Sequence, residues 1–237
     1  TGIEVSQLST FPMDHPDTFR TASQLREIIT DLGWRKIVAF QTRNPMHRAH
    51  EEVCRIACER INADGLIIHM LLGKLKEGDI PAKTRDECIR TMVASYFHDL
   101  PVLISGYGFD MLYAGPREAL LHAIVRQNLG ATHLIIGRDH AGIGNFYGEF
   151  EAQEIFDKWH DVSELQIQIF KADHAAYSKK LEKVVMLNEV DNHQVVDFVT
   201  LSGTKLRELL ANGQLPPAEV VRPEVAEILI DFYKLNK

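Results

Sequence analysis

Ten residues in the first quarter of the chain concentrate side chains that bind anions: Gln41-Thr-Arg-Asn-Pro-Met-His-Arg-Ala-His50. They follow the apolar run Ile37–Phe40, which is typical of a strand, and precede a helical pattern that begins near Arg48. The first turn of a helix carries free backbone N–H groups and the positive end of the helix dipole, which both favour negative charge. With two arginines, this stretch predicts a phosphate or sulfate site at a strand-to-helix junction.

Within this stretch, His47 and His50 are three residues apart, which places two side chains on one face of a helix. We expect the helix to span residues 45–62, with Pro45 in its first turn because proline lacks an N–H. Imidazoles placed there can donate hydrogen bonds to an oxygen that gains charge during a reaction. Such a pair is also common as a structural feature, so the pair alone does not establish catalysis.

A second polar stretch, Gly137-Arg-Asp-His-Ala-Gly142, follows the apolar run His133–Gly137. Its two glycines permit a close approach of the backbone to a ligand. Arg138 can add positive charge opposite Arg43, and Asp139 and His140 can contact ribose or phosphate. The alternative is an ordinary turn at the end of a strand, with Asp139 capping it.

A third stretch, Leu201-Ser-Gly-Thr-Lys-Leu-Arg207, places the hydroxyl groups of Ser202 and Thr204 just before a helix. The simplest interpretation is N-capping by Ser202 or Thr204. A helix N-terminus can also hold phosphate groups, so the same residues predict a second phosphate-binding element.

These stretches must be positioned by a larger frame, in which apolar runs alternate with helical patterns. That alternation predicts an α/β fold with a parallel sheet and helices on both faces. We expect strands at 34–41, 66–72, 102–105, 133–137 and 166–170, and helices at 21–29, 45–62, 81–97, 115–126 and 150–159.

Ligands of such sheets bind beyond the carboxyl ends of the strands. The first two polar stretches both follow predicted strands, so we expect Arg43 and Arg138 to line one cleft. The chain beyond residue 175 is less regular: it predicts a strand at 183–187, a helix from 201 to 211 and a final amphipathic helix that Pro223 opens. Its apolar face is expected to contain Val225, Ile228, Leu229 and Phe232.

The overall composition excludes several classes of protein. The 237 residues carry a formal net charge of −7, so we expect no nucleic-acid partner. Three cysteines fit a reducing compartment, and we expect the cytoplasm. Cys54 and Cys58 are expected to be buried apolar residues rather than a metal-binding pair. We find no apolar run long enough to cross a membrane and no signal peptide, so no membrane partner is expected.

The combination QTRNPxHxxH at residues 41–50 resembles the signature of the ATP sulfurylases. Its HxxH also resembles the HxGH motif of the wider adenylyl- and cytidylyltransferases, with Ala49 in place of glycine. Residues 69–82, 111–123, 201–207 and 222–229 match further family motifs, so the resemblance covers about residues 15–233. It is closest to the sulfurylases of sulfur-oxidising bacteria.

The resemblance implies a Rossmann-like nucleotidyltransferase sheet with a small C-terminal α/β extension. Residues 1–20 would be a linker from an N-terminal PUA-like domain that is missing here. Residues 21–174 would be the catalytic domain and 175–237 a C-terminal subdomain. Residues 188–198 contain His193 but no cysteine, where some members bind zinc, so no zinc or other protein-bound metal is expected. The phosphate-binding loop of kinases is also absent from the sequence.

The implied reaction is ATP plus sulfate giving adenosine 5′-phosphosulfate (APS) plus pyrophosphate. It is reversible, proceeds by direct in-line attack of sulfate on the α-phosphate, and uses Mg²⁺ bound to ATP. Partners would be these substrates and products, and further copies of the chain. The implied catalytic residues are Thr42, Arg43, Asn44, His47 and His50. The implied sulfate-binding residues are Gln41, Arg43 and Ala141, the last through its backbone. The implied nucleotide-binding residues are Gln41, Arg43, Asn44, His47, His50, Gly137, Arg138, Asp139, His140, Val185, Ser202 and Thr204.

Two other functions fit the same residues. The chain could be an adenylyltransferase that uses a different acceptor, in which case sulfate would not be required. It could also be a module that binds nucleotide without catalysis. A site that retains both QTRN and HxxH weighs against the second alternative.

Overall fold

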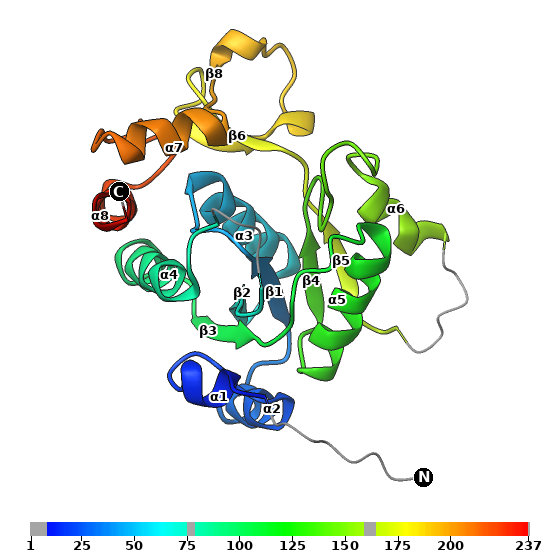
Figure 1. The fold of residues 1–237 in the computed structure, drawn as a ribbon. Coiled ribbons are helices and arrows are strands. Elements are labelled where there is room, and N and C mark those ends of the chain that lie inside the picture. The colour runs from blue at the N-terminus through cyan, green and yellow to red at the C-terminus, as the bar shows by residue number, and fades with distance from the viewer. Residues whose placement is uncertain (1–8, 75–78, 159–164, 237) are drawn as a thin grey trace.

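The structure is a computed structural model that describes residues 9–74, 79–158 and 165–236. Its centre is a sheet of five parallel strands in the order β3-β2-β1-β4-β5 (Figure 1). The strands are β1 (Ile37–Thr42), β2 (Gly65–Leu71), β3 (Val102–Tyr107), β4 (His133–Ile136) and β5 (Gln168–Lys171). Successive strands are added on one side of β1 as far as β3, and then on its other side from β4 onwards. The switch point between β1 and β4 is where ligands of such sheets bind.

Helices cover both faces of this sheet, as the alternation of side chains in β1 requires. Val38 and Phe40 belong to one core cluster, whereas Ile37 and Ala39 belong to the other. The first cluster includes side chains of α3, α4 and α8, and the second those of α2, α5 and α6. The helices are α2 (Ala22–Asp31), α3 (Arg48–Ile61), α4 (Ala82–Tyr96), α5 (Pro116–Asn128), α6 (Glu151–Lys158), α7 (Gly203–Ala211) and α8 (Pro223–Leu235). This arrangement confirms the predicted α/β fold.

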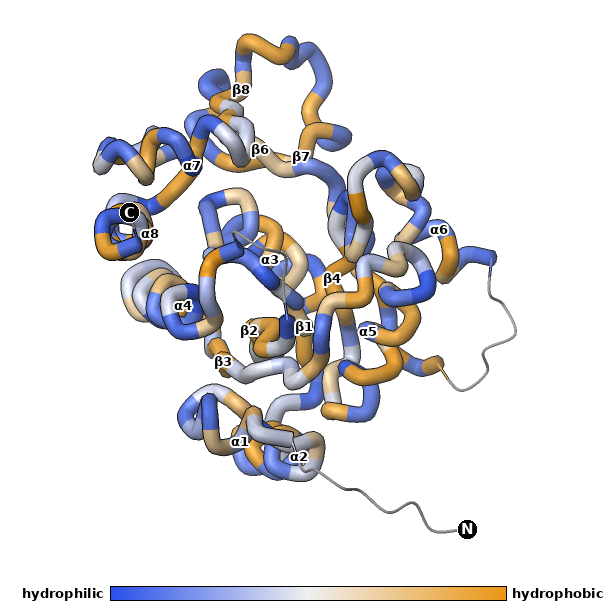
Figure 2. Tube along the Cα trace, viewed as in Figure 1, coloured by the Kyte–Doolittle hydropathy of each residue, from blue (hydrophilic) through white to orange (hydrophobic). Residues whose placement is uncertain are grey.

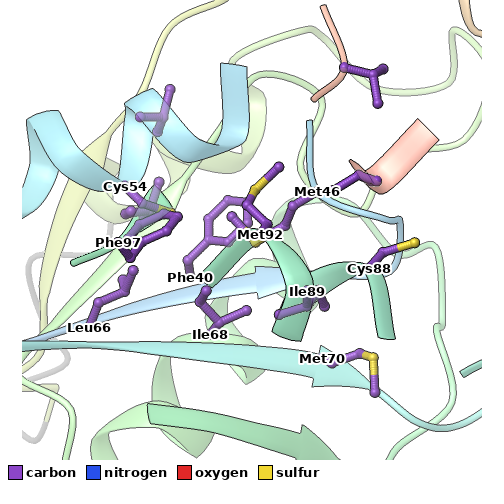
Figure 3. Close-up of a cluster of buried hydrophobic side chains, with 14 of the residues drawn as sticks. Phe40, Met46, Cys54, Leu66, Ile68, Met70, Cys88, Ile89, Met92 and Phe97 are labelled. Atoms are coloured by element: carbon purple, nitrogen blue, oxygen red, sulfur yellow. The ribbon is translucent and has the colours of Figure 1, made fainter. Parts of the chain in front are cut away.

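The larger core lies between β1, β2 and the helices α3 and α4 (Figure 3). Cys54 and Cys88 lie within it and are fully buried, and Cys58 is buried beside them. Burial raises the pKa of the Cys54 thiol well above its usual value, so this side chain is an uncharged apolar group at neutral pH. Hydrophobic segments gather in the strands of the central sheet, and hydrophilic segments lie around them (Figure 2).

All five predicted strands of the central sheet are present, and each differs from its predicted bounds by one to three residues at one or both ends. β3 extends to Tyr107 rather than ending at Ser105, because Tyr107 pairs with Leu71 of β2. β5 begins at Gln168 rather than 166, because the backbone N–H groups of residues 166 and 167 donate to the side chain of Gln127.

The C-terminal part differs more from the prediction. β6 (Ala175–Ser178), β7 (Lys183–Met186) and β8 (Phe198–Val199) form a separate antiparallel sheet in the order β7-β6-β8. Only β7 was expected, because β8 contains just two residues, and β6 (AAYS) lacks the β-branched pair of β7 (KVVM) although it has the same length. Short 3₁₀ helices, η1 (Leu187–Glu189) and η2 (Val195–Asp197), lie between β7 and β8.

The buried face of α8 also differs from the prediction. Val225 and Leu229 are buried as expected, but Ala226 and Ile230 complete the face, while Ile228 and Phe232 are only half-buried. α8 contacts both α4 and α7, so more than one side of the helix is covered.

The N-terminal part packs against the edge of β3. The short helix α1 (Phe11–Asp14) was not expected, and four residues are too few to show a helical period. Phe19 forms a parallel bridge with Gly106 of β3. Thr21 caps α2 with a capping box that it forms with Gln24. Within the described ranges, no helix is long and apolar enough to cross a bilayer.

Candidate active site

The junction between β1 and α3 contains the first polar stretch. His47 has an extended backbone (φ −125°, ψ 174°) and is the N-cap of α3, which begins at Arg48. The expectation that the helix begins at Pro45 was therefore wrong. The reason is a tertiary contact: the Arg48 N–H donates to the carbonyl oxygen of Val220 at 3.0 Å. A loop from the C-terminal part of the chain thus fixes the start of α3.

Two side chains shape the loop before α3. The buried Thr42 hydroxyl donates to the carbonyl oxygen of Asn44 at 2.8 Å and accepts from its N–H at 3.1 Å. Arg43 forms an ion pair with Asp79 at 3.3 Å, and its guanidinium lies over the ring of Tyr113. An anion that binds Arg43 must therefore compete with the Asp79 carboxylate.

The rings of His47 and His50 stack on each other, with centroids 3.6 Å apart. Burial, and then the nearby His174, lower the pKa of His47 from 6.5 to about 4. Burial, and then His47, lower the pKa of His50 well below its usual value. Both rings are therefore neutral hydrogen-bonding groups at neutral pH, not cations.

The turn after β4 contains the second polar stretch. Asp139 and Ala141 both have positive φ, at 52° and 57°, although neither is glycine, and His140 between them does not. Alternating backbone of this kind turns successive N–H groups into one concave anion-binding surface. A residue other than glycine at positive φ stores backbone strain, and such strain is often found at functional sites.

Side chains on this turn have partners of their own. Arg138 forms an ion pair with Glu149, which raises the pKa of the guanidinium, and its Nη1 lies 3.3 Å from His174 Nδ1. The side chain of Asp139 folds back on the turn, since a Cβ atom at Gly142 would lie 1.9 Å from its Oδ1. Within the turn, the backbone carbonyl oxygen of Asp139 accepts from the Gly142 N–H at 3.2 Å.

The two polar stretches line a single cavity of about 810 Å³. Arg43 and Arg138 both line it, which confirms the expectation that they share one cleft. This volume is within the usual range for a small-molecule site. The predicted site residues around it are Gln41, Thr42, Arg43, Asn44, His47, His50, Gly137, Arg138, Asp139, His140 and Ala141.

A second cavity, of about 1100 Å³, adjoins the first and shares Arg43 and His47 with it. It extends to the start of α7, where Ser202 lines it and also caps the helix by accepting from Lys205 N at 3.2 Å. Both interpretations of Ser202 are thus compatible with its position. Thr204 and Val185 are not among the residues that line either cavity.

Among the polar residues around the cleft that the sequence did not predict, three lie beside predicted site residues. His174 follows β5 and lines both cavities, and its place after a predicted strand was the available signal. Asp79 and Glu149 pair with the two arginines, and neither pairing has a local sequence signal because partners are far apart or separated by an irregular loop.

Metal-binding groups of three or more histidine, cysteine or acidic side chains are not found in the described part of the chain. His193, from the segment where zinc was considered, hydrogen-bonds the Ser178 hydroxyl at 2.9 Å and the Asp191 carbonyl oxygen at 3.0 Å. The expectation of no zinc stays a prediction.

The fold and the strand-end cleft define a nucleotide-binding class of α/β protein, and comparison with known proteins specifies the family. The model of the ATP-sulfurylase family matches residues 16–232. The chain therefore belongs to the ATP-sulfurylase family.

Curated relatives agree with this assignment. The sulfate adenylyltransferase of Allochromatium vinosum is 60% identical over 232 residues, which are 98% of this chain and 58% of that protein. That of Alcanivorax borkumensis is 61% identical with the same coverage, and that of Chlorobaculum tepidum is 45% identical over 231 residues, 98% of this chain and 56% of that protein. The chain thus spans somewhat over half the length of these relatives.

Among solved structures, a chain described as a hexameric APS kinase from Thiobacillus denitrificans is similar, with a TM-score of 0.69. The match covers 91% of this chain and 40% of that chain, at 23% sequence identity. At this identity the similarity establishes the fold alone.

Proposed function

We propose that this chain is the catalytic part of a sulfate adenylyltransferase, which converts ATP and sulfate to APS and pyrophosphate in a reversible reaction. The observation that carries the proposal is the single cavity lined by both Arg43 and Arg138 at the ends of β1 and β4. Membership of the ATP-sulfurylase family indicates which substrates this cavity would bind.

Sulfate binds at the donor-rich end of the cleft. Arg43 supplies the positive charge, Gln41 a side-chain amide and Ala141 a backbone N–H. These three residues come from two different strand ends and line the same cavity, which supports a common ligand.

The nucleotide binds along the turn after β4 and the start of α3. Gly137, Arg138, Asp139 and His140 contact the adenosine and the α-phosphate, and Ser202 extends the phosphate-binding surface towards α7. Thr204 and Val185 are weaker candidates, because neither side chain lines the cleft. The family resemblance implies that the backbone near Val185 binds the nucleotide, and this role is kept in the proposal.

Catalysis consists of positioning and charge stabilisation. A sulfate oxygen attacks the α-phosphorus in line with the departing pyrophosphate, so no protein nucleophile takes part. Thr42 and Asn44 hold Arg43 in a fixed loop at the reacting centre. His47 and His50 donate hydrogen bonds to the oxygens that gain charge, which neutral imidazoles can do.

Mg²⁺ enters with ATP, bound to its phosphate groups, as is usual for this ion. Bound there, it would supply positive charge that offsets the charge of the departing pyrophosphate. Two carboxylates beside the cleft, Asp79 and Glu149, are already paired with arginines, which fits a metal held mainly by the substrate. A cytoplasmic location and self-association complete the proposal; the three buried, free cysteines fit a reducing compartment.

The test is APS formation from Mg-ATP, measured by chromatography with sulfate present, omitted, or replaced by other acceptors. We expect APS and pyrophosphate in equal amounts and only with sulfate. Adenylylation of another acceptor would instead assign a different transferase. Binding of APS without turnover in either direction would indicate a non-catalytic nucleotide-binding module.

A further inference from the structure

A buried polar cluster lies behind the cleft, on the face of the sheet that α5 covers. The side chains of Glu118 and His122, one turn apart on α5, are each 1% exposed and lie 3.4 Å apart. His122 Nε2 is also 3.3 Å from Gln41 Nε2, and His122 Nδ1 is 2.9 Å from His140 Nε2. The cluster therefore joins α5 to both polar stretches of the site.

The position of the proton on His122 follows from its neighbours. Glu118 accepts from the N–H groups of Leu112 at 2.9 Å and Ala114 at 3.0 Å. Although burial raises the pKa of Glu118, these bonds and His122 lower it overall, so the group is an ionised acceptor. His122 must present Nε2–H to that carboxylate. Burial keeps the ring neutral, which leaves Nδ1 to accept from His140.

This tautomer decides how the Gln41 amide must lie. The amide has two orientations that differ by half a turn about its last bond. With Nε2 towards His122, two donors face each other, and Oε1 is buried without a hydrogen-bond partner in the described part of the chain. In the opposite orientation the oxygen shares the Nε2–H of His122 with Glu118. The N–H₂ group then takes the buried, unpartnered place of the oxygen beside the cavity that Gln41 lines, where a bound anion would give it an acceptor.

Gln41 is also the one sulfate-binding residue of the proposal that can offer either polarity. The Arg43 guanidinium only donates. The Ala141 carbonyl oxygen already accepts from the N–H of Gly115 at 3.0 Å, which leaves the Ala141 N–H for a ligand. The orientation of the Gln41 amide therefore determines whether these three residues offer the anion any acceptor.

We propose that Glu118 and His122 are positioning residues that hold the Gln41 amide with its N–H₂ group towards the bound oxyanion. The resulting donor-only site selects sulfate over phosphate. Sulfate is fully deprotonated at neutral pH, whereas inorganic phosphate keeps at least one O–H, which would face donors and stay unpaired. This inference rests on the proposed function, because it assigns the acceptor half of the same cleft.

The experiment compares the KM of sulfate with the inhibition constant of phosphate, using APS formation by the whole chain. His122→Leu and Glu118→Gln remove the constraint on the amide. In both variants we expect the ratio of the phosphate inhibition constant to the sulfate KM to fall about tenfold. This is the change expected for one misplaced hydrogen bond. His122→Gln, whose amide can donate from the position of Nε2, should retain most of the wild-type ratio.

A merely structural role would weaken sulfate and phosphate binding together and leave the ratio unchanged in His122→Leu and Glu118→Gln, which would overturn the inference. A wild-type chain that forms no APS would instead overturn the proposed function. If the variants do not fold, the ring-nitrogen NMR signals of His122 in the wild-type chain decide. A proton on Nε2 supports the inference, and a proton on Nδ1 alone contradicts it.

Discussion

Neutral imidazoles face the cleft at the start of α3. His47 and His50 stack on each other, and burial, followed by the neighbouring His47, lowers the pKa of His50. The cationic groups that line the same cavity are arginines, Arg43 and Arg138. This division leaves the histidines as donors whose contribution is greatest when charge develops on a substrate oxygen.

The first prediction concerns His47. We expect His47→Ala to lower kcat by about 10²–10³-fold, as for other donors to developing charge, while the Kd of APS rises by less than about tenfold. Steady-state kinetics and calorimetry measure the two effects. Exposed His98 on the surface provides the control, since His98→Ala should change neither. Equal losses of turnover and affinity would reduce His47 to a binding residue.

The second prediction concerns pH and stability. The pKa of His47 is about 4 in the folded chain and 6.5 when unperturbed. Between these values the unfolded chain binds a proton that the folded chain does not, so stability is lost as pH falls from 7. From pH 7 to 5 this one ring contributes a loss of up to about 2 kcal/mol.

Urea unfolding at pH 7 and pH 5 measures that loss. His47→Gln should lose less free energy of unfolding than the wild type over this interval, whereas His98→Gln should lose the same amount as the wild type. A His47→Gln variant with the wild-type pH dependence would show that His47 is protonated normally in the folded state.

At the scale of residues, the sequence predicted the site residues that lie within recognisable motifs. It did not predict the residues that reach the cleft only through tertiary structure. Arg43 and Arg138 were both expected in one cleft because both follow strands of one sheet. Their partners, Asp79 and Glu149, could not be predicted, since pairing depends on how the intervening loops fold.

At the scale of elements, the start of α3 depends on the C-terminal part of the chain. Glu51, in the first turn of α3, is almost fully buried and accepts two hydrogen bonds from Arg222, at 2.9 and 2.8 Å. Arg222 is the N-cap of α8, and its neighbouring loop residue Val220 bonds Arg48. This ion pair therefore fixes α8 against the helix whose start presents His47 and His50.

The third prediction tests this contact. Glu51→Gln leaves the half-buried Arg222 guanidinium without its charged partner, and we expect a loss of about 2–3 kcal/mol in the free energy of unfolding. The exposed pair Arg60–Glu189 is the matched control, since Glu189→Gln should cost less than about 1 kcal/mol. Similar losses in the two variants would mean that the Glu51 pair does not anchor α8.

The elements that the sequence predicted best are those with a long, regular pattern. Strands such as β2, buried on both faces, read as continuous apolar runs. By contrast, β8 contains two residues and exists through its pairing with β6, which no local pattern encodes.

At the scale of the whole molecule, one core joins the central sheet to the C-terminal elements. The same cluster contains Ile68 of β2, Val184 of β7 and Leu229 of α8. The second cavity is likewise shared, since its lining runs from Arg43 to Ser202. Both cavities are thus lined by elements from the two parts of this chain, which spans somewhat over half the length of its curated relatives.

The most direct test of the central claim is the affinity of APS and of AMP, measured by calorimetry for the wild-type chain, Arg43→Gln and Arg138→Gln. APS spans both halves of the proposed cleft, whereas AMP lacks the sulfate group. We predict that Arg43→Gln weakens APS binding about tenfold or more and AMP binding less, while Arg138→Gln weakens both to a similar degree. A wild-type chain that does not bind APS, or an Arg43→Gln variant that binds it with unchanged affinity, would contradict the account.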